Sequence, residues 1–334
     1  MVDLDLKQLV SEIKGYMGIT RKKQIGEVVA SFPRLEDQLT DLEILADFGE
    51  DAAVFYPPSS NTDDQALLLA ADGIMPVMIE ADAYWSGYCS VLVNLHDIAA
   101  MGGRPLAMVD VITVRDKVVL SELTRGMKDA CKKFGVPIVG GHIHPDGEYN
   151  ALDVAILGTV KRSRVIYSHT ARVGDNVIMA MDLDGRIHPK TRFAWDSTLH
   201  KDPDQVRAQL LIMEKLGSLD LLNSGKDISN PGALGTLGML LESSKLGALV
   251  DLNLIPRPDS QLVEFSHWLK VYQGCGFVVS CNVKQTKDII NLFNSVGLMA
   301  DVVGKITETR KLIVKSNHDL ETLFDFDQES ITGI

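Results

Sequence analysis

The stretch that decides the fold reads VNLHDIAAMGGRP over residues 93–105. Its apolar positions complete a helix predicted over residues 87–101, and the two glycines and the proline at its end stop that helix because neither residue type continues one well. Asp97 lies inside this otherwise apolar helix. Burying a lone carboxylate is costly, so Asp97 needs a partner, a metal ion or access to water.

Two more carboxylates stand at the ends of apolar segments nearer the N-terminus. Asp51 lies in FGEDAAV (48–54), where a glycine turn leads into a short predicted strand, and Asp72 follows the apolar run 67–71, which has the length of a buried strand. Oxygen ligands from separated segments suit Mg²⁺, which takes one or two carboxylates together with substrate phosphates. The alternative is that these acids and Asp97 are turn residues and helix caps.

A glycine-histidine segment, GGHIHPD over residues 140–146, follows a strand predicted over 136–139 and is itself expected to be a loop. Glycine lets backbone N–H groups approach a phosphate closely, which makes Gly140 and Gly141 candidates for such a contact. His142 could bind a metal or transfer protons, although a loop histidine is more often simply solvated. The chain contains no GxxxxGK[ST], GxSxG or HExxH motif, which weakens P-loop, serine-hydrolase and zinc-protease interpretations.

Helix and strand patterns alternate along the whole chain. With short loops between them they predict an α+β (mixed α/β) protein of two lobes, separated by a polar turn near residues 163–174 into residues 1–165 and 166–334. Further predicted segments are a helix over 3–31, strands over 107–114 and 152–160, and a helix from an N-cap at Ser121 to a stop at Gly135.

Composition excludes several classes of protein. The 334 residues include 33 Lys and Arg against 45 Asp and Glu, a net charge of −12, which argues against a general nucleic-acid binder. The N-terminus lacks the apolar core of a signal peptide, and no apolar run reaches the roughly 18–20 residues that span a bilayer. We therefore expect a cytoplasmic protein without membrane partners. Its scattered cysteines are expected to be buried thiols: Cys89, Cys131, Cys275 and Cys281.

These segments, taken in order, resemble the motifs of the aminoimidazole ribonucleotide synthetase-like ATP-binding proteins. Residues 48–54 resemble the GDDAAV segment of thiamine-monophosphate kinase, 93–105 its NLSDIAAMGARP helix, and 226–230 (KDISN) its DISDG. Asp72 falls where that kinase has a strand-ending aspartate. Residues 140–143 (GGHI) are similar to the GGHSI of selenophosphate synthetase. The resemblance covers most of the chain, from about residue 48 to 310.

The resemblance implies a two-lobed fold whose N-terminal sheet lobe forms a homodimer and whose C-terminal lobe closes over the site. It implies ATP and Mg²⁺ as cofactors and phosphoryl transfer to a small molecule. The implied metal ligands are Asp51, Asp72 and Asp97, which His142 or Asp146 would complete. The residues implied near the nucleotide are Gly49, Asn94, Gly140 and Gly141. Asp227 would face the substrate as a catalytic residue, with His142. Lys22 could reach a phosphate from its basic segment, although a solvated turn is the alternative.

At several positions the sequence differs from the motifs of these families, and these differences bear on which member of the superfamily it resembles. His142 replaces the metal-binding aspartate of the kinase's GGD, Asn230 replaces the second aspartate of DISDG, and residues 273–277 (QGCGF) stand where the kinase has GGEDYEL. The reactive cysteines of selenophosphate synthetase and of the hydrogenase-maturation relative are absent. The segments 182–186 and 227–232 resemble most the uncharacterised branch labelled aminoimidazole ribonucleotide synthetase-related, which includes a methanogenesis-marker group.

Two functions from different classes follow. The leading hypothesis is a Mg²⁺- and ATP-dependent phosphotransferase, or an ATP-activating synthetase, acting on a small metabolite. The alternative is an ATP-binding regulatory or assembly protein without turnover, because the substitutions at His142, Asn230 and 273–277 are those that loss of activity would leave. Thiamine-monophosphate kinase itself is a third hypothesis, which the same substitutions disfavour.

Overall fold

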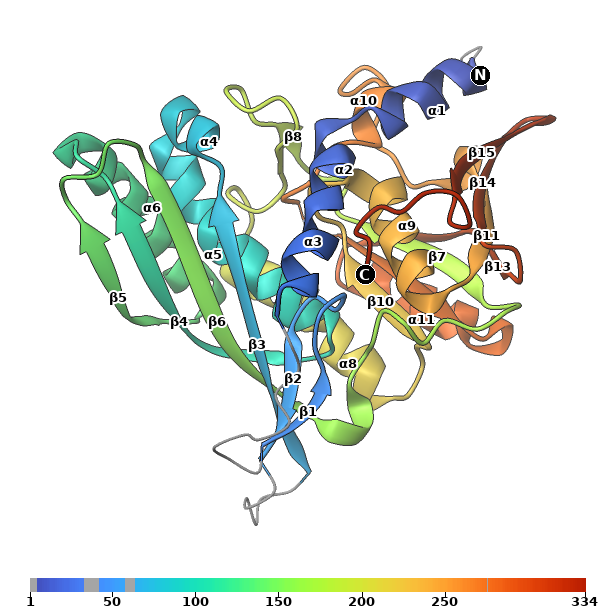
Figure 1. The fold of residues 1–334 in the computed structure, drawn as a ribbon, viewed down its shortest axis with the longest axis horizontal. Coiled ribbons are helices and arrows are strands. Elements are labelled where there is room, and N and C mark those ends of the chain that lie inside the picture. The colour runs from blue at the N-terminus through green and yellow to red at the C-terminus, as the bar shows by residue number, and fades with distance from the viewer. Residues whose placement is uncertain (1–4, 33–41, 58–63, 275) are drawn as a thin grey trace.

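Two β-sheets and the helices packed on them make up the protein (Figure 1). The computed structural model describes residues 5–32, 42–57, 64–274 and 276–334. One sheet has six strands and the other seven, and a short two-stranded ribbon, β8 (Arg186–Ile187) with β9 (Trp195–Asp196), stands apart from both. The predicted mixed α/β, two-lobed architecture is confirmed.

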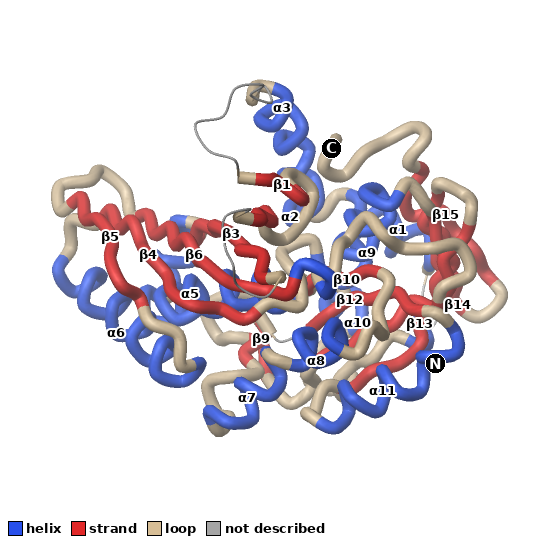
Figure 2. Tube along the Cα trace, turned by 90° about the horizontal axis from the view of Figure 1, so that it is seen from below, coloured by secondary structure: helices blue, strands red, loops and turns tan. Residues whose placement is uncertain are grey.

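The first sheet has the strand order β1-β2-β3-β6-β4-β5. Its neighbouring strands are antiparallel except for the parallel pair β4 and β5, which a crossover helix connects. Helices cover one face of this sheet, and the other face is open along β3, β6 and β4 (Figure 2). The strands are β1 (Glu43–Ala46), β2 (Ala53–Tyr56), β3 (Gln65–Ile74), β4 (Arg104–Thr113), β5 (Ile138–His144) and β6 (Ala151–Lys161), and the helices are α4 (Pro76–Ala81), α5 (Ala83–Ala100) and α6 (Lys117–Phe134).

The second sheet has the order β10-β12-β7-β13-β11-β14-β15 and is covered on both faces. Successive residues of β7 alternate between two cores: Val177 and Met179 pack with α9 and α1, whereas Ile178 and Ala180 pack with α7, α8 and α11. The strands are β7 (Asn176–Met181), β10 (Ser224–Asp227), β11 (Gly247–Asp251), β12 (Gly276–Cys281), β13 (Met299–Thr307), β14 (Lys311–Ser316) and β15 (Asp319–Asp325). The helices are α7 (Pro203–Leu210), α8 (Ile212–Ser218), α9 (Gly232–Ser244), α10 (Phe265–Trp268) and α11 (Thr286–Ser295).

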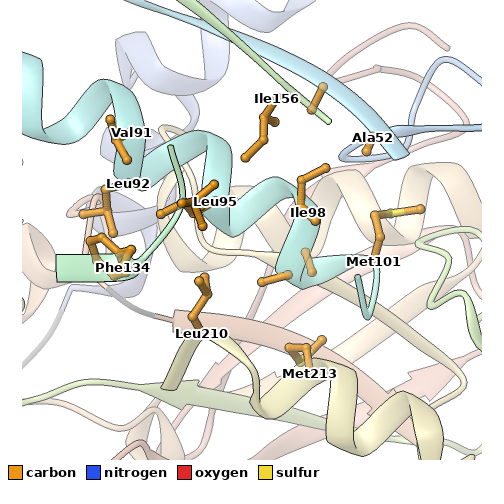
Figure 3. Packing of buried hydrophobic residues seen from close by; sticks show 14 of the residues in the cluster. Ala52, Val91, Leu92, Leu95, Ile98, Met101, Phe134, Ile156, Leu210 and Met213 are labelled. Carbon is orange, nitrogen blue, oxygen red and sulfur yellow. The ribbon is translucent and has the colours of Figure 1, made fainter. Parts of the chain in front are cut away.

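Helix α5 is the element that both lobes share. It is apolar around its circumference because the first sheet, α6 and the second lobe each cover one side of it. Figure 3 shows Leu95 and Ile98 of α5 in the core that also contains Ile156 of β6 and Leu210 and Met213 of the second lobe. The hydrophobic packing is therefore continuous across the predicted boundary at residue 165, which falls in the connection between β6 and β7.

The N-terminal segment differs from the single helix predicted over residues 3–31. It forms α1 (Leu6–Lys14), α2 (Met17–Thr20), a 3-10 turn (Arg21–Lys23) and α3 (Gln24–Ala30). Helices α1 and α2 bury their apolar side chains in the core of the second lobe. The segment then crosses in front of the molecule to reach the first sheet (Figure 1). Residues near the N-terminus therefore pack with the lobe predicted to begin at residue 166.

Three local predictions are wrong in informative ways. Helix α6 begins earlier than predicted, because Asp116 rather than Ser121 caps it, and its end at the left-handed Gly135 is as expected. Strand β3 continues past Asp72 to Ile74, where it stays paired with β6. The predicted loop over residues 140–146 is largely strand, because pairing with β4 satisfies its backbone.

Two predictions from the sequence, the lack of a membrane-spanning helix and the burial of the cysteines, can be compared with the structure. In the part of the chain that the structure describes, no helix has both the length and the apolar character needed to cross a membrane. Cys89 and Cys281 are buried free thiols, as expected, and Cys131 is only partly buried. Cys275 lies outside the described residues.

The crossing of α5 and α6 depends on two glycines. A Cβ atom on Gly126 would lie 2.0 Å from the Tyr84 carbonyl oxygen, and one on Gly87 would lie 2.0 Å from that of Leu123. We expect Gly126→Ala to lower the free energy of unfolding by about 1–3 kcal/mol or more, because backbone must move to admit the methyl group. Urea denaturation measures this effect. Ser121→Ala, exposed on the same helix, is the control and should change stability by less than about 0.5 kcal/mol; equal stability of the two variants would contradict the close approach.

Candidate functional site

A large cavity of about 1430 Å³ lies between the first sheet, α3 and the second lobe. It is larger than the roughly 300–1,000 Å³ of an ordinary small-molecule pocket. The turn before β2, strand β3, one residue of α5, the end of β10 and two of the last three residues, Thr332 and Ile334, contribute to its lining. Its apolar lining consists mainly of Ile25, Phe32, Ile44, Phe48, Phe55, Leu69, Met239 and Ile334.

Seven carboxylates line the same cavity, and four of them come from four separate segments and form the group discussed here. Asp51 comes from the turn before β2, Asp72 from β3, Asp97 from α5 and Asp227 from the end of β10. The turn that carries Asp51 requires Gly49, whose φ of +101° is a conformation that side chains disfavour. All four acids were named as site residues from the sequence, and the structure places them around one cavity.

Asp51 forms a buried ion pair with Lys226, the residue before Asp227. The ammonium of Lys226 also donates to the Gly49 carbonyl over 3.4 Å. Although burial lowers the pKa of Lys226, the carboxylates of Asp51 and Glu50 outweigh that effect and raise it, so the lysine stays charged. The second carboxylate oxygen of Asp51, Oδ2, is buried and has no hydrogen-bond partner among the described residues.

Two other acids of the cavity, Asp97 and Asp227, have too little positive charge around them. Burial raises the pKa of Asp97 well above its usual range, and the charges of Asp227 and Asp72 raise it further. Burial, with the charge of Asp51, raises the pKa of Asp227 to about 8. These shifts mean that ionising the whole cluster is unfavourable without an added cation.

The cluster is spread along the cavity wall. Across the described ranges, no three His, Cys, Asp or Glu side chains lie close enough together to hold one metal ion. Mg²⁺ usually binds through only one or two carboxylates and completes its shell with phosphates and water. The unpartnered Oδ2 of Asp51 and the unneutralised Asp97 fit that kind of site.

A small pocket of about 90 Å³ adjoins the large cavity and shares Lys22, Asp72, Asp97, Asp227 and Ser229 with it. Burial lowers the pKa of His96 to about 4, so its imidazole is neutral. The remaining wall of the small pocket includes Arg21, Ile74, Met75, Met78, Val93, His96, Ile228, Asn230, Tyr272 and Gln273.

The end of the chain closes one side of the large cavity. The buried carboxylate of Glu242, in α9, accepts hydrogen bonds from the backbone N–H of Ile331 at 3.0 Å and of Thr332 at 2.9 Å. The carbonyl of Thr332 accepts from the N–H of Gly26, in α3, at 2.9 Å. These contacts hold α3 and the C-terminal segment side by side at the cavity, as Figure 1 also shows.

Six residues predicted from the sequence line the large cavity: Lys22, Gly49, Asp51, Asp72, Asp97 and Asp227. Asn94 does not line it, because its side chain is buried within the helix layer and its Nδ2 donates to the Ser90 carbonyl at 2.8 Å. Its Oδ1 has no partner in the described part of the chain.

The glycine-histidine segment lies elsewhere. Gly140, Gly141 and His142 belong to β5, the edge strand farthest from β1, and Asp146 follows it on the exposed surface. Along the register from Asp72 through β6 and β4 to Gly141 there are three strand spacings, about 14 Å. None of these four residues lines the cavity within one chain, so the predicted phosphate contact and metal ligands are not brought to the acids there.

Three residues of the site were missed. Lys226 carries little sequence signal, because its strand β10 reads SGKD and no apolar run marks the lysine as buried. His96 was quoted as part of a motif without a role, and Gln273 was counted only as a departure from a relative. The position of His96 and Gln273 in one pocket depends on packing between α5 and the second lobe, which no local pattern indicates.

Comparisons with known proteins agree with this architecture. The family model described as AIR synthase related protein, N-terminal domain, matches residues 49–160, and the C-terminal domain model matches 164–317. The uncharacterised protein MJ0640 of Methanocaldococcus jannaschii is 44% identical over 330 residues, which is 99% of this chain and 100% of that protein.

More distant relatives have named activities. A selenide, water dikinase of Clostridioides difficile is 26% identical over 239 residues, covering 70% of this chain and 66% of that protein. The structure of T. maritima PurL complexed with ATP superposes with a TM-score of 0.72 at 17% identity, covering 94% of this chain and 50% of that one. The family matches and the near-complete alignment with MJ0640 confirm the resemblance found in the motifs: the chain belongs to the AIR synthase-related family.

Proposed function

We propose that the protein is a Mg²⁺- and ATP-dependent enzyme that transfers a phosphoryl group from ATP to a small metabolite. The observation that carries this proposal is the group of four carboxylates with one ion-paired lysine on the wall of a cavity large enough for a nucleotide. The names of similar proteins support the proposal: one relative is a selenide, water dikinase, and the structure of T. maritima PurL was determined with ATP.

In this proposal, different residues of the cavity would bind the nucleoside, the phosphates and the metal ion. The apolar residues near Phe48 and Leu69 would contact the nucleoside, and Lys22 would approach the phosphates from the N-terminal segment. Asp51 and Asp97 would supply the one or two carboxylates of a Mg²⁺ site that phosphates and water complete, and Asp72 would lie beside it on the same wall; the metal would neutralise phosphate charge. In the transfer, the bond from the acceptor oxygen to phosphorus forms as the bond from phosphorus to the ADP oxygen breaks, and the acceptor proton is released. Catalysis then consists mainly of positioning and charge neutralisation.

Asp227 is placed for a different role in this proposal. It lies where the large cavity and the small pocket meet, and its pKa of about 8 makes its ionised form a stronger base than an ordinary carboxylate. We assign it to the acceptor side of the reaction, where it would receive the acceptor's proton during transfer.

The open face of the first sheet supports a homodimer. Val109, Val111 and Leu157 are each more than a third exposed and lie on the adjacent strands β4 and β6, on the face away from α5. A contiguous apolar surface of this kind marks an interaction site on a protein surface. A second copy of the chain would cover it by packing the same face against its own.

Asp97→Asn separates the metal-binding role from stability. We expect Mg²⁺-dependent ATP binding, measured by calorimetry, to weaken about tenfold or more, the loss typical of a contact to a charged group. The unfolding midpoint should stay level or rise, because the variant removes a carboxylate whose ionised form is disfavoured by burial. Asp146→Asn is the matched control and should change neither quantity; unchanged ATP binding by Asp97→Asn would exclude the assignment.

Turnover distinguishes an enzyme from an ATP-binding regulatory or assembly protein. With Mg²⁺, ATP and a pool of small metabolites, we expect the wild type to release ADP. Asp227→Asn should lower the rate more than it lowers ATP affinity, because Asp227 acts on the acceptor. Tight ATP binding without ADP release from any metabolite fraction would favour the regulatory alternative. Thiamine phosphate, assayed separately, tests the kinase hypothesis.

The dimer can be tested by placing a charge on the open sheet face. Val109→Glu should shift the molar mass measured by light scattering from that of two chains to that of one, because the interface would bury an unpaired carboxylate. Val118→Glu, at an exposed position of α6, should leave the mass unchanged. A wild-type protein that is monomeric at all concentrations tested would contradict the proposal.

A further inference from the structure

We propose that the small pocket binds the acceptor molecule and selects an uncharged group, an amide or a hydroxyl, that donates a hydrogen bond to Oε1 of Gln273. This inference rests on the proposed function, since the pocket adjoins the carboxylates assigned to the transfer. It assigns a specificity-determining residue and a chemical class of acceptor.

Gln273 is held rigidly with an unused acceptor atom. Its side chain is only 4% exposed, and its Oε1 is buried without a hydrogen-bond partner among the described residues. Its Nε2 lies 3.7 Å from the sulfur of Met78. A thioether sulfur is a weak acceptor, so this contact suits the amide nitrogen and leaves the oxygen free for a ligand.

The backbone that carries Gln273 is also unusual. Its φ of +71° is uncommon for any residue other than glycine. Pairing of the preceding residue, Tyr272, with the two-stranded ribbon holds the segment in place: the N–H of Tyr272 donates to Phe193 at 3.0 Å, and its carbonyl accepts from Trp195 at 2.9 Å. Strained conformations of this kind concentrate at ligand-binding sites.

The size and lining of the pocket limit what can enter. A volume of about 90 Å³ is several times the roughly 10–15 Å³ that a single water molecule needs, so a head group of a few atoms fits and a larger group does not. Met75, Met78 and Val93 supply apolar wall, and Asp97 and Asp227 lie where the pocket meets the large cavity.

Those contacts disfavour an anion at the Gln273 end. A carboxylate there would direct its oxygens at another acceptor atom and would lie near uncompensated acids. Arg21 and Lys22, which also line the pocket, are available to an anionic substituent farther along the acceptor. An N–H or O–H group would give Gln273 the hydrogen bond that it lacks.

Acetamide and acetate are matched probes, because both have four non-hydrogen atoms and only acetamide carries N–H donors. We expect saturation-transfer NMR with the full chain to detect millimolar binding of acetamide and weaker binding of acetate. Gln273→Met preserves side-chain length and removes the acceptor oxygen, so it should weaken acetamide about three- to tenfold, as expected for one neutral hydrogen bond. Gln273→Glu restores acceptor oxygens and should retain acetamide while still excluding acetate.

The same samples separate this inference from the proposed function. ATP affinity and the melting temperature of Gln273→Met should match the wild type, which shows that the variant is folded with its large cavity intact. Equal binding of acetamide by wild type and Gln273→Met, or preference for acetate, would overturn the inference even if ATP binds. Absence of ATP binding with Gln273-dependent acetamide binding would overturn the proposed function and leave the selectivity of the pocket standing.

Discussion

The buried ion pair between Asp51 and Lys226 is the contact on which the site depends. It joins the turn before β2, in the first lobe, to β10, in the second. Removing two charges from water is costly, and their attraction compensates only when the geometry is good and further hydrogen bonds are made. Lys226 makes one more such bond, to Gly49, whereas Asp51 keeps one oxygen unpartnered. The pair therefore fixes the two lobes against each other and leaves unused ligand capacity at their junction.

Helix α5 carries the second constraint. Two consecutive residues of this helix, His96 and Asp97, line the small pocket, and Asp97 also lines the large cavity. Most of the other residues of the helix are packed in the core. A site built on a buried helix is held more exactly in position than one on a loop. The close crossing with α6 at Gly87 and Gly126 fixes this helix further. The packing of α5 in the core and against α6, which mainly stabilises the fold, thus also fixes the geometry of the site.

The sequence was most informative where chemistry and local pattern coincide. Asp97 stood out because a carboxylate interrupted an apolar helix, and Asp51 because glycine marked its turn. The segment at 140–146 was misassigned because glycines and histidines are typical of loops, and only the parallel pairing with β4 makes it strand. The contact of Gln273 with Met78 joins residues 195 positions apart. No periodicity or spacing within a segment carries information about such a contact.

The hydrogen bond between Gly26 and Thr332 has a consequence for folding. It joins the first helices of the described chain to its last residues, so it closes almost the longest loop that the chain can form. Loop closure of this length costs the most entropy, and contacts distant in sequence form slowly. We therefore expect one wall of the large cavity to be completed late in folding. A ligand that needs this wall discriminates between finished and partly folded molecules, and its binding energy stabilises only the finished ones.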